Sequence, residues 1–258
     1  MTTAPPPQQN AGLNSLLETI VAPASAFDRL AEIPTWGWAF IATSILAMLT
    51  GLLSAPIQAH LSHILIAQQA AAAANPQQAA AIAQGGAFAE KFASFGFIFA
   101  PIGVLVFALI GTVLLLIGNA IFGGKANFKQ LWCATVNILV VFMIGAVVGG
   151  ILQSVRGPDA FTSVADIYRN SLTLAALAPT GNIKLLAILA AITPFSLWVL
   201  WLNSLLMQRI GRLAPPKAWI VAALVLVVPA LATAGFAKQP PGSANLNSPP
   251  AASASTAP

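Results

Sequence analysis

Five apolar runs, each long enough to cross a bilayer and none containing a charged residue, constrain this sequence more than any other feature. They cover residues 36–57, 95–122, 131–155, 185–207 and 218–236. A hydrocarbon core about 30 Å thick is crossed by roughly 20 apolar residues in a helix. A charged residue at its centre costs about 2.5 to 3.5 kcal/mol on insertion scales. The runs predict an all-α fold, a polytopic transmembrane helical bundle with five spans.

The composition excludes a soluble domain. Of the 258 residues, 58% are hydrophobic and 7% are charged, whereas soluble domains carry about 25% charged residues. The net charge of +5 comes from basic residues that stand mostly singly beside apolar runs. We therefore expect membrane lipids with anionic headgroups, and no nucleic acid, as the counter-charge. The single cysteine, Cys133, provides neither a disulfide nor a thiolate cluster for a metal.

The chain divides into three parts. Residues 1–35 form a segment with an amphipathic helix, residues 36–237 hold the five spans, and residues 238–258 are a tail whose Pro, Ala and Ser content predicts disorder. The helix in the first part is indicated by apolar residues at helical spacing: Leu13, Leu16, Leu17, Ile20 and Val21. It either lies on the membrane surface or packs against the bundle, and the spacing fits both.

Two long connections have helical character. The alanine-rich connection 58–94 is predicted to extend the first helix, to turn near Pro76 and to return as a second helix, although alanine bias alone would produce the same pattern without a function. The connection 156–183 is predicted to form an interfacial helix. One side of that helix would carry the apolar residues Phe161, Val164, Ile167, Tyr168, Leu172 and Leu174.

The positions of lysine and arginine predict the orientation, because short loops rich in these residues stay in the cytoplasm. Two short loops carry most of the basic residues on the side of the N-terminus: Lys125, Lys129, Arg209, Arg212 and Lys217. The opposite side spreads its charges over longer connections. The N-terminus is therefore predicted to be cytoplasmic and, with five spans, the C-terminus to lie across the membrane.

The spans contain few polar side chains that could support catalysis or ion coupling. Their amides are Asn119, Asn137 and Asn203, which we expect to make interhelical hydrogen bonds. No ionisable side chain lies at depth. His60 and His63 could supply two metal ligands, but a zinc site needs more. We predict no catalytic residue, no cofactor, no metal and no enzymatic activity.

Three stretches resemble one membrane family. They are ETIVAPASAFDRLAEIPTW before the first span, LLLIGNAIFGGKANFKQLW across the end of the second, and PPKAW before the last. Together they are similar to bacterial members of the Yip domain (Ypt-interacting protein) family of five-span integral membrane proteins, over residues 13–236. The most specific piece is the glycine, lysine and phenylalanine loop at residues 123–130, and Pro23, Phe27 and Pro34 to Trp36 fit the family's segment before the first span.

The resemblance implies a non-enzymatic scaffold or membrane organiser in the inner membrane, with a cytoplasmic N-terminus. The acidic, tyrosine-containing motif that accompanies GTPase binding in eukaryotic relatives is absent, so that activity is not carried over. Lys125, Phe128 and Lys129 are the predicted contact site for lipid or for another membrane or cytoplasmic protein; an ordinary turn with lysines on the cytoplasmic side explains the same residues. The alternative function is a small-molecule or lipid transporter, or a subunit of one.

Overall fold

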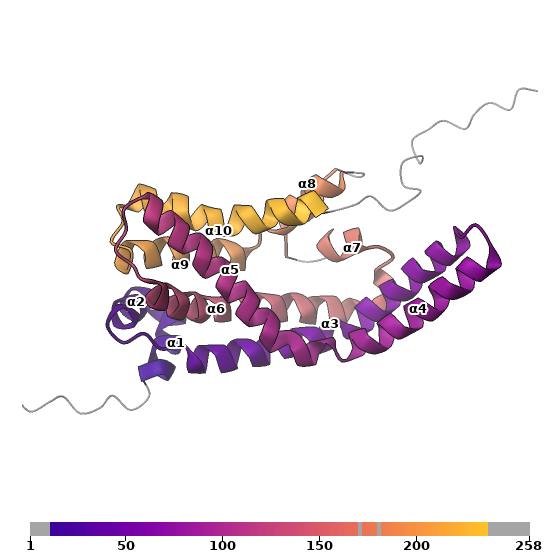
Figure 1. The fold of residues 1–258 in the computed structure, drawn as a ribbon, viewed down its shortest axis with the longest axis horizontal. Helices are drawn as coiled ribbons and strands as arrows, with labels where there is room; N and C mark the ends of the chain where they lie inside the picture. Colours follow the sequence, from indigo (N-terminus) through magenta and orange to yellow (C-terminus); the bar gives the residue numbers. More distant parts are fainter. Residues whose placement is uncertain (1–10, 170–171, 180–181, 237–258) are drawn as a thin grey trace, which may run out of the picture.

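The computed structural model describes residues 11–169, 172–179 and 182–236. The regular structure in these ranges is helical (Figure 1), which confirms the predicted all-α bundle. The predicted tail at 238–258 lies outside the described residues. The helices are α1 (Ala11–Val21), α2 (Pro23–Glu32), α3 (Gly37–Ala71), α4 (Pro76–Ser94), α5 (Ala100–Ile121), α6 (Phe128–Arg156), α7 (Val164–Arg169), α8 (Ile183–Ala190), α9 (Pro194–Arg209) and α10 (Pro215–Phe236), with 3-10 turns η1 (Gly96–Phe99), η2 (Pro158–Ala160) and η3 (Leu174–Leu177).

Four of the described helical segments are long and apolar enough to cross a membrane, which makes the chain an integral membrane protein. They are Gly37–Ala71, Gly96–Ile121, Phe128–Arg156 and Pro215–Gly235. A fifth candidate exists only if α8 and α9, which meet at an angle of 60°, count as one broken span. The number of crossings is thus four or five by length and composition.

The break between α8 and α9 differs from the continuous span predicted over 185–207. Thr193 has an extended backbone and starts α9 as a new helix: its side chain accepts a hydrogen bond from the Ser196 N–H, and the Ser196 hydroxyl in turn accepts one from the Thr193 N–H. Pro194 occupies the first helical position and has no N–H with which to continue α8. The apolar composition of the segment concealed this local cap.

The long helices form two pairs, with one helix crossing between them. In Figure 1, α3 and α6 run side by side in one layer, α9 and α10 form the other, and α5 crosses diagonally and contacts α3, α6 and α10. Where the layers meet, the core is fully buried and made of apolar side chains, among them Leu115, Leu131, Leu202, Leu206 and Val221.

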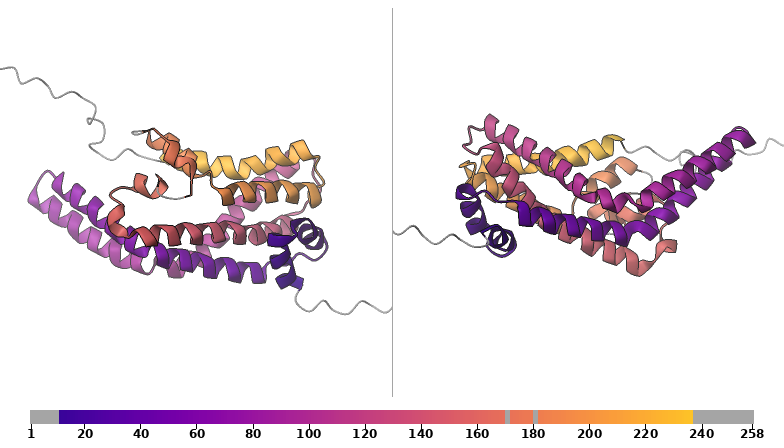
Figure 2. Two further views of the ribbon diagram at one scale, coloured as in Figure 1. Left: turned by 180° about the vertical axis from the view of Figure 1, so that it is seen from behind. Right: turned by 60° about the horizontal axis from the view of Figure 1, so that its bottom comes forward.

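The alanine-rich connection forms a helical hairpin, as predicted. α3 continues unbroken to Ala71, α4 returns from Pro76, and the two pack against each other where they project beyond the bundle (Figures 1 and 2). Asn75 starts α4 by accepting a hydrogen bond from the Gln78 N–H at 2.8 Å. A Cβ on Gly86 would lie 2.5 Å from Cδ1 of Ile66, so the two helices touch closely at this point.

The interfacial helix predicted over 156–183 is wrong. The described residues of this connection form only η2, the short α7 and η3, because Gly157 has φ of 78° and ends α6, and Thr173 caps a separate turn. Its apolar residues do not share one face. Phe161 is fully buried in a cluster with Ile57 and Leu61, whereas Leu172 is 48% exposed.

Candidate functional site

The loop between α5 and α6 is built by two glycines with different roles. Gly123 has φ of 73°, in the left-handed region that favours glycine after a helix. Gly124 donates its N–H to the Asn119 carbonyl at 2.7 Å and lies so close to the Asn119 side chain that a Cβ would collide with Oδ1. Of the two glycines, only Gly123 has a positive φ. Asn127 then starts α6 through a capping box with Gln130.

This loop is joined to the loop between α9 and α10. The Lys125 N–H donates to the carbonyl oxygen of Gly211 at 2.9 Å. Gly211 is buried, and a Cβ at this position would lie 2.6 Å from the Met207 carbonyl oxygen. Arg212 follows with φ of 57°, which reverses the chain before α10. Two turns that are distant in sequence therefore form one surface at one end of the bundle.

We call this surface the basic end, defined by five exposed cations: Lys125, Lys129, Arg209, Arg212 and Lys217. It lies at the end of the bundle where Figure 1 shows both loops together with α1 and α2. Arg209 pairs with Asp28 at 3.4 Å, and both side chains are about half exposed. Lys125, Lys129, Arg212 and Lys217 form no ion pair with any residue in the described ranges. Their charges are available to an anionic partner.

α2 is docked on the bundle at this end. Phe27 and Leu30 are fully buried in the main core. The Gln130 side chain donates from Nε2 to the Ala31 carbonyl at 2.8 Å, which links the start of α6 to α2. α2 therefore packs against the bundle.

α1 packs only in part against the bundle. Leu16 is 8% exposed and packs in a core cluster with Val136 and Leu139. Leu17 and Val21, on the same helix, are 54% and 79% exposed. The apolar stripe is thus divided between contact with the bundle and an open face.

Aromatic rings follow one another along the same end. Phe128 stacks on Trp132 with centroids 6.2 Å apart, Trp132 meets Trp36 edge-on at 6.0 Å, and Trp36 meets Phe40 at 5.6 Å. Phe128 and Trp36 are 45% and 40% exposed. Tryptophan and other aromatic rings are typical of the headgroup boundary of membrane proteins. Lys125 and Lys129 lie in the loop and the first turn of α6 around Phe128.

The predicted interhelical role of the three amides is wrong in detail. Asn119 donates to the Ala126 carbonyl in the adjoining loop at 3.1 Å. Asn137 donates to the Cys133 carbonyl on its own helix and to Thr35, in the linker before α3, at 3.1 Å. Asn203 donates to Val199 on its own helix at 2.9 Å. Two of the amides therefore fix loops at the basic end.

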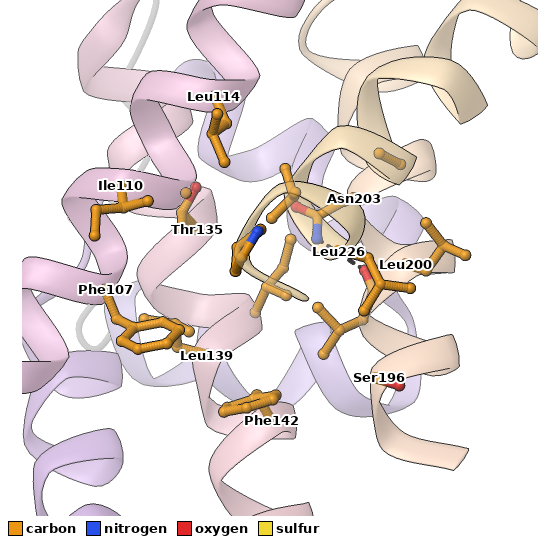
Figure 3. Close-up of a pocket in the computed structure, with 16 residues that line it drawn as sticks. Phe107, Ile110, Leu114, Thr135, Leu139, Phe142, Ser196, Leu200, Asn203 and Leu226 are labelled. Atoms are coloured by element: carbon orange, nitrogen blue, oxygen red, sulfur yellow. Dashed lines mark hydrogen bonds between the residues drawn. The ribbon is translucent and has the colours of Figure 1, made fainter. Parts of the chain in front are cut away.

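A second feature, a cavity of about 100 Å³, lies inside the bundle (Figure 3). α5, α6, α9 and α10 each contribute to its lining, which is mainly leucine, isoleucine, valine and phenylalanine. Its polar side chains are Thr135, Ser196 and Asn203. The sequence did not predict this cavity, although Asn203 was noted as a polar residue in an apolar span, because its walls come from four helices.

The described residues contain no group of three or more His, Cys, Asp and Glu side chains that could hold a metal ion. His60 and His63 follow the apolar part of α3, toward the α4 hairpin and away from the basic end. Neither histidine is among the residues that line the cavity.

Comparison with known proteins identifies the family. The family model described as Yip1 domain matches residues 17–237, which include α2 to α10, both loops of the basic end and the cavity. No curated protein gives a significant match, and neither does any solved structure. The family comprises membrane proteins, in agreement with the apolar helices. The chain belongs to the Yip1 domain family of integral membrane proteins.

Proposed function

We propose that this protein is a non-enzymatic organiser of the inner membrane, and that the basic end is its working surface on the cytoplasmic side. The observation that carries the proposal is the hydrogen bond from the Lys125 N–H to the Gly211 carbonyl. That bond unites two loops, so that five exposed cations stand on one surface instead of two. Lys125, Phe128 and Lys129 are its proposed contact residues.

The chemistry of this surface fits anionic headgroups. A lysine or arginine near an anionic membrane surface contributes about 1 kcal/mol. Phe128 and Trp36 have the exposed rings that settle at the headgroup level. Leu17 and Val21 give α1 an open apolar face, which is suited to the interface. A partner protein with an acidic surface would bind to the same cations. Of the two, lipid is the partner that we propose.

A comparison of charge-reversed variants tests the lipid partner. Lys125→Glu/Lys129→Glu, purified in mild detergent, should bring down less anionic lipid, with the ratio of anionic to zwitterionic lipid falling more than about tenfold. Lys184→Glu is the control, because Lys184 is exposed on α8, away from the basic end. Equal ratios in the double variant and the wild type would refute lipid recruitment by this surface. Cross-linking before purification reports whether a protein partner is lost with the same variant.

The orientation is tested by cysteine labelling. Ala74→Cys lies in the turn of the α3–α4 hairpin and Lys217→Cys at the basic end, and both positions are exposed. Cys133 is 1% exposed and should contribute little background. In intact cells an impermeant maleimide should label position 74 only, and position 217 should react after permeabilisation. Labelling of both positions from outside would overturn the cytoplasmic placement.

A second candidate function is a carrier for a small molecule or lipid. It is supported by the 60° break between α8 and α9, because broken helices build the substrate sites of many transporters. Ser196, in the first turn of α9, lines the cavity, so the broken end faces that space. Uptake of a solute into vesicles containing the purified protein, and its loss on Ser196→Phe, would favour this candidate over the organiser.

A further inference from the structure

We propose that the cavity between α5, α6, α9 and α10 holds part of one acyl chain of a diacyl glycerolipid, and that the Thr135 hydroxyl donates a hydrogen bond to the ester carbonyl of that lipid. This inference goes beyond the organiser function, because it concerns the interior of the bundle and not the basic end. It rests on the lining of the cavity, on an unpartnered buried hydroxyl and on the depth of that hydroxyl in the membrane.

The cavity is apolar and its rim faces outward. In Figure 3, Leu139 and Phe142 of α6 face Leu200 and Leu226 across the space. At the rim, Phe107 and Ile110 of α5 are 54% and 48% exposed. These residues lie within the span Gly96–Ile121, where the surroundings are lipid chains and not water. A chain can therefore enter sideways from the bilayer.

The size suits a few methylene groups. An apolar cavity of about 150 Å³ in another protein stays dry and binds benzene, so a cavity of about 100 Å³ has room for a short stretch of hydrocarbon. Between the cavity and the basic end, α5 and α10 are in close contact, because a Cβ on Gly118 would lie 2.5 Å from Cγ1 of Val221. The open part therefore lies deeper in the span than this contact.

Thr135 supplies the polar anchor. It is 6% exposed, and its Oγ1 is buried without a hydrogen-bond partner although it lines the cavity. Thr43 and Thr50 of α3 satisfy their hydroxyls on the carbonyl four residues earlier, Thr43 on Ala39 at 2.7 Å and Thr50 on Leu46 at 2.9 Å, whereas Thr135 of α6 and Thr112 of α5 do not. A buried hydroxyl left unpaired costs about 1 to 3 kcal/mol. An acceptor within the cavity would remove that cost.

The depth of Thr135 matches an ester group. Thr135 follows Phe128 by seven residues on α6, a rise of about 10 Å. Phe128 belongs to the aromatic cluster that marks the headgroup level, and each interfacial layer is about 5 to 7 Å thick. Thr135 thus lies just inside the hydrocarbon, next to the ester carbonyls. Leu139 and Phe142, one and two turns deeper, continue the path that the acyl chain would follow.

Native mass spectrometry of detergent-purified protein, titrated with defined lipids, tests the proposal. Dioleoyl phosphatidylglycerol should add to the wild type with one saturable tight site, and dioleoyl phosphatidylcholine should fill the same site because the chain and ester are shared. Oleic acid, which lacks the ester, should bind more weakly. Preferred binding of oleic acid, or occupancy by detergent alone, would overturn the glycerolipid assignment.

Four variants locate the site. Thr135→Val should weaken the tight site about fivefold, the effect of one lost hydrogen bond, and Thr135→Ser should retain it. Thr112→Val is the matched control, because the Thr112 hydroxyl is also buried without a partner but does not line the cavity. Ile110→Trp places bulk at the exposed rim, where folding is least affected, and should block entry. Unchanged lipid binding in both Thr135→Val and Ile110→Trp, or an equal loss in Thr112→Val, would refute the proposal.

Discussion

The backbone N–H of Lys125 donates to the carbonyl oxygen of Gly211 at 2.9 Å, and this bond joins the turn after α5 to the turn before α10. Each turn has its own local construction, with Gly123 in a left-handed conformation in one and Arg212 in the other. The bond fixes their relative position. The arrangement of charge at the basic end therefore depends on backbone geometry and not only on the presence of lysine and arginine.

Gly211→Ala should weaken this junction. Its Cβ would lie 2.6 Å from the Met207 carbonyl oxygen, and a backbone atom cannot move aside as a flexible side chain can. We predict a loss of about 1 to 3 kcal/mol, typical of overpacking, seen as a lower midpoint of thermal unfolding in detergent. Gly37→Ala is the control, because no atom lies within 4 Å of its Cβ position. The prediction fails if the two variants unfold at the same temperature.

Gln130→Ala should loosen α2. The substitution removes the bond from Nε2 to the Ala31 carbonyl and half of the capping box with Asn127. The expected cost is about 1 to 2 kcal/mol, and hydrogen exchange should become faster in residues 23–32. Gln78→Ala removes a comparable capping amide in the α3–α4 hairpin and should leave α2 unchanged. Equal exchange of α2 in the wild type and in Gln130→Ala would contradict the tether.

Neighbouring glycines in α4 should respond differently to alanine. Gly85 has no atom within 4 Å of its Cβ position, so Gly85→Ala should stabilise the helix by up to about 1 kcal/mol through helix propensity. Gly86→Ala would place a Cβ 2.5 Å from the Ile66 side chain, and that clash should cancel the gain or reverse it. Limited proteolysis of the hairpin measures both effects. Equal resistance of the two variants would argue against tight α3–α4 packing.

Asp166 should give the start of α7 a pH dependence. Burial raises the pKa of Asp166, but hydrogen bonds donated by the side chains and N–H groups of Thr162 and Ser163 outweigh it and hold that pKa below its ordinary value of 3.8. A lowered pKa means that the carboxylate stabilises the folded state above the unfolded pKa, and that this stabilisation is lost as the pH falls through the folded pKa.

The matching measurement is hydrogen exchange of the Thr162 and Ser163 amides, corrected for intrinsic rates. In the wild type we predict full protection near about pH 6 and a decline below about pH 4. Asp166→Asn removes the titrating group, and its protection should be low and constant across this range. A wild-type protection that stays constant down to about pH 3 would disprove the assignment.

Much of the bundle was predictable because its signals are local. Long charge-free apolar runs are stable as helices in a lipid bilayer, so α3, α5, α6 and α10 follow from composition and length. The α3–α4 hairpin follows from helix propensity on both sides of Pro76. The glycine and lysine loop at 123–130 indicated the family, and the Yip1 domain match over residues 17–237 confirms it.

Other features depended on contacts between distant segments. The fourth span appeared continuous, yet Thr193 and Ser196 form the cap of a new helix that begins at Pro194. The apolar residues of the connection 156–183 have helical spacing, yet Phe161 is buried against α3 and the connection does not form one continuous helix. Asn137 was expected to form a hydrogen bond with another span, but its side chain donates to the Thr35 carbonyl in the linker before α3. In each case a specific tertiary or capping contact outweighed the average apolar pattern.

By itself, the sequence determined that the chain is an all-α integral membrane protein, because the free energy of placing apolar helices in lipid is a sum over residues and does not depend on how they pack. Only the tertiary structure decided that two loops share one basic surface and that Thr135, whose hydroxyl has no hydrogen-bond partner, lines an apolar cavity. Those features arise where helices converge or diverge by a few ångströms. Such distances are set by pairs of residues far apart in the chain, such as Gly118 with Val221 and Lys125 with Gly211.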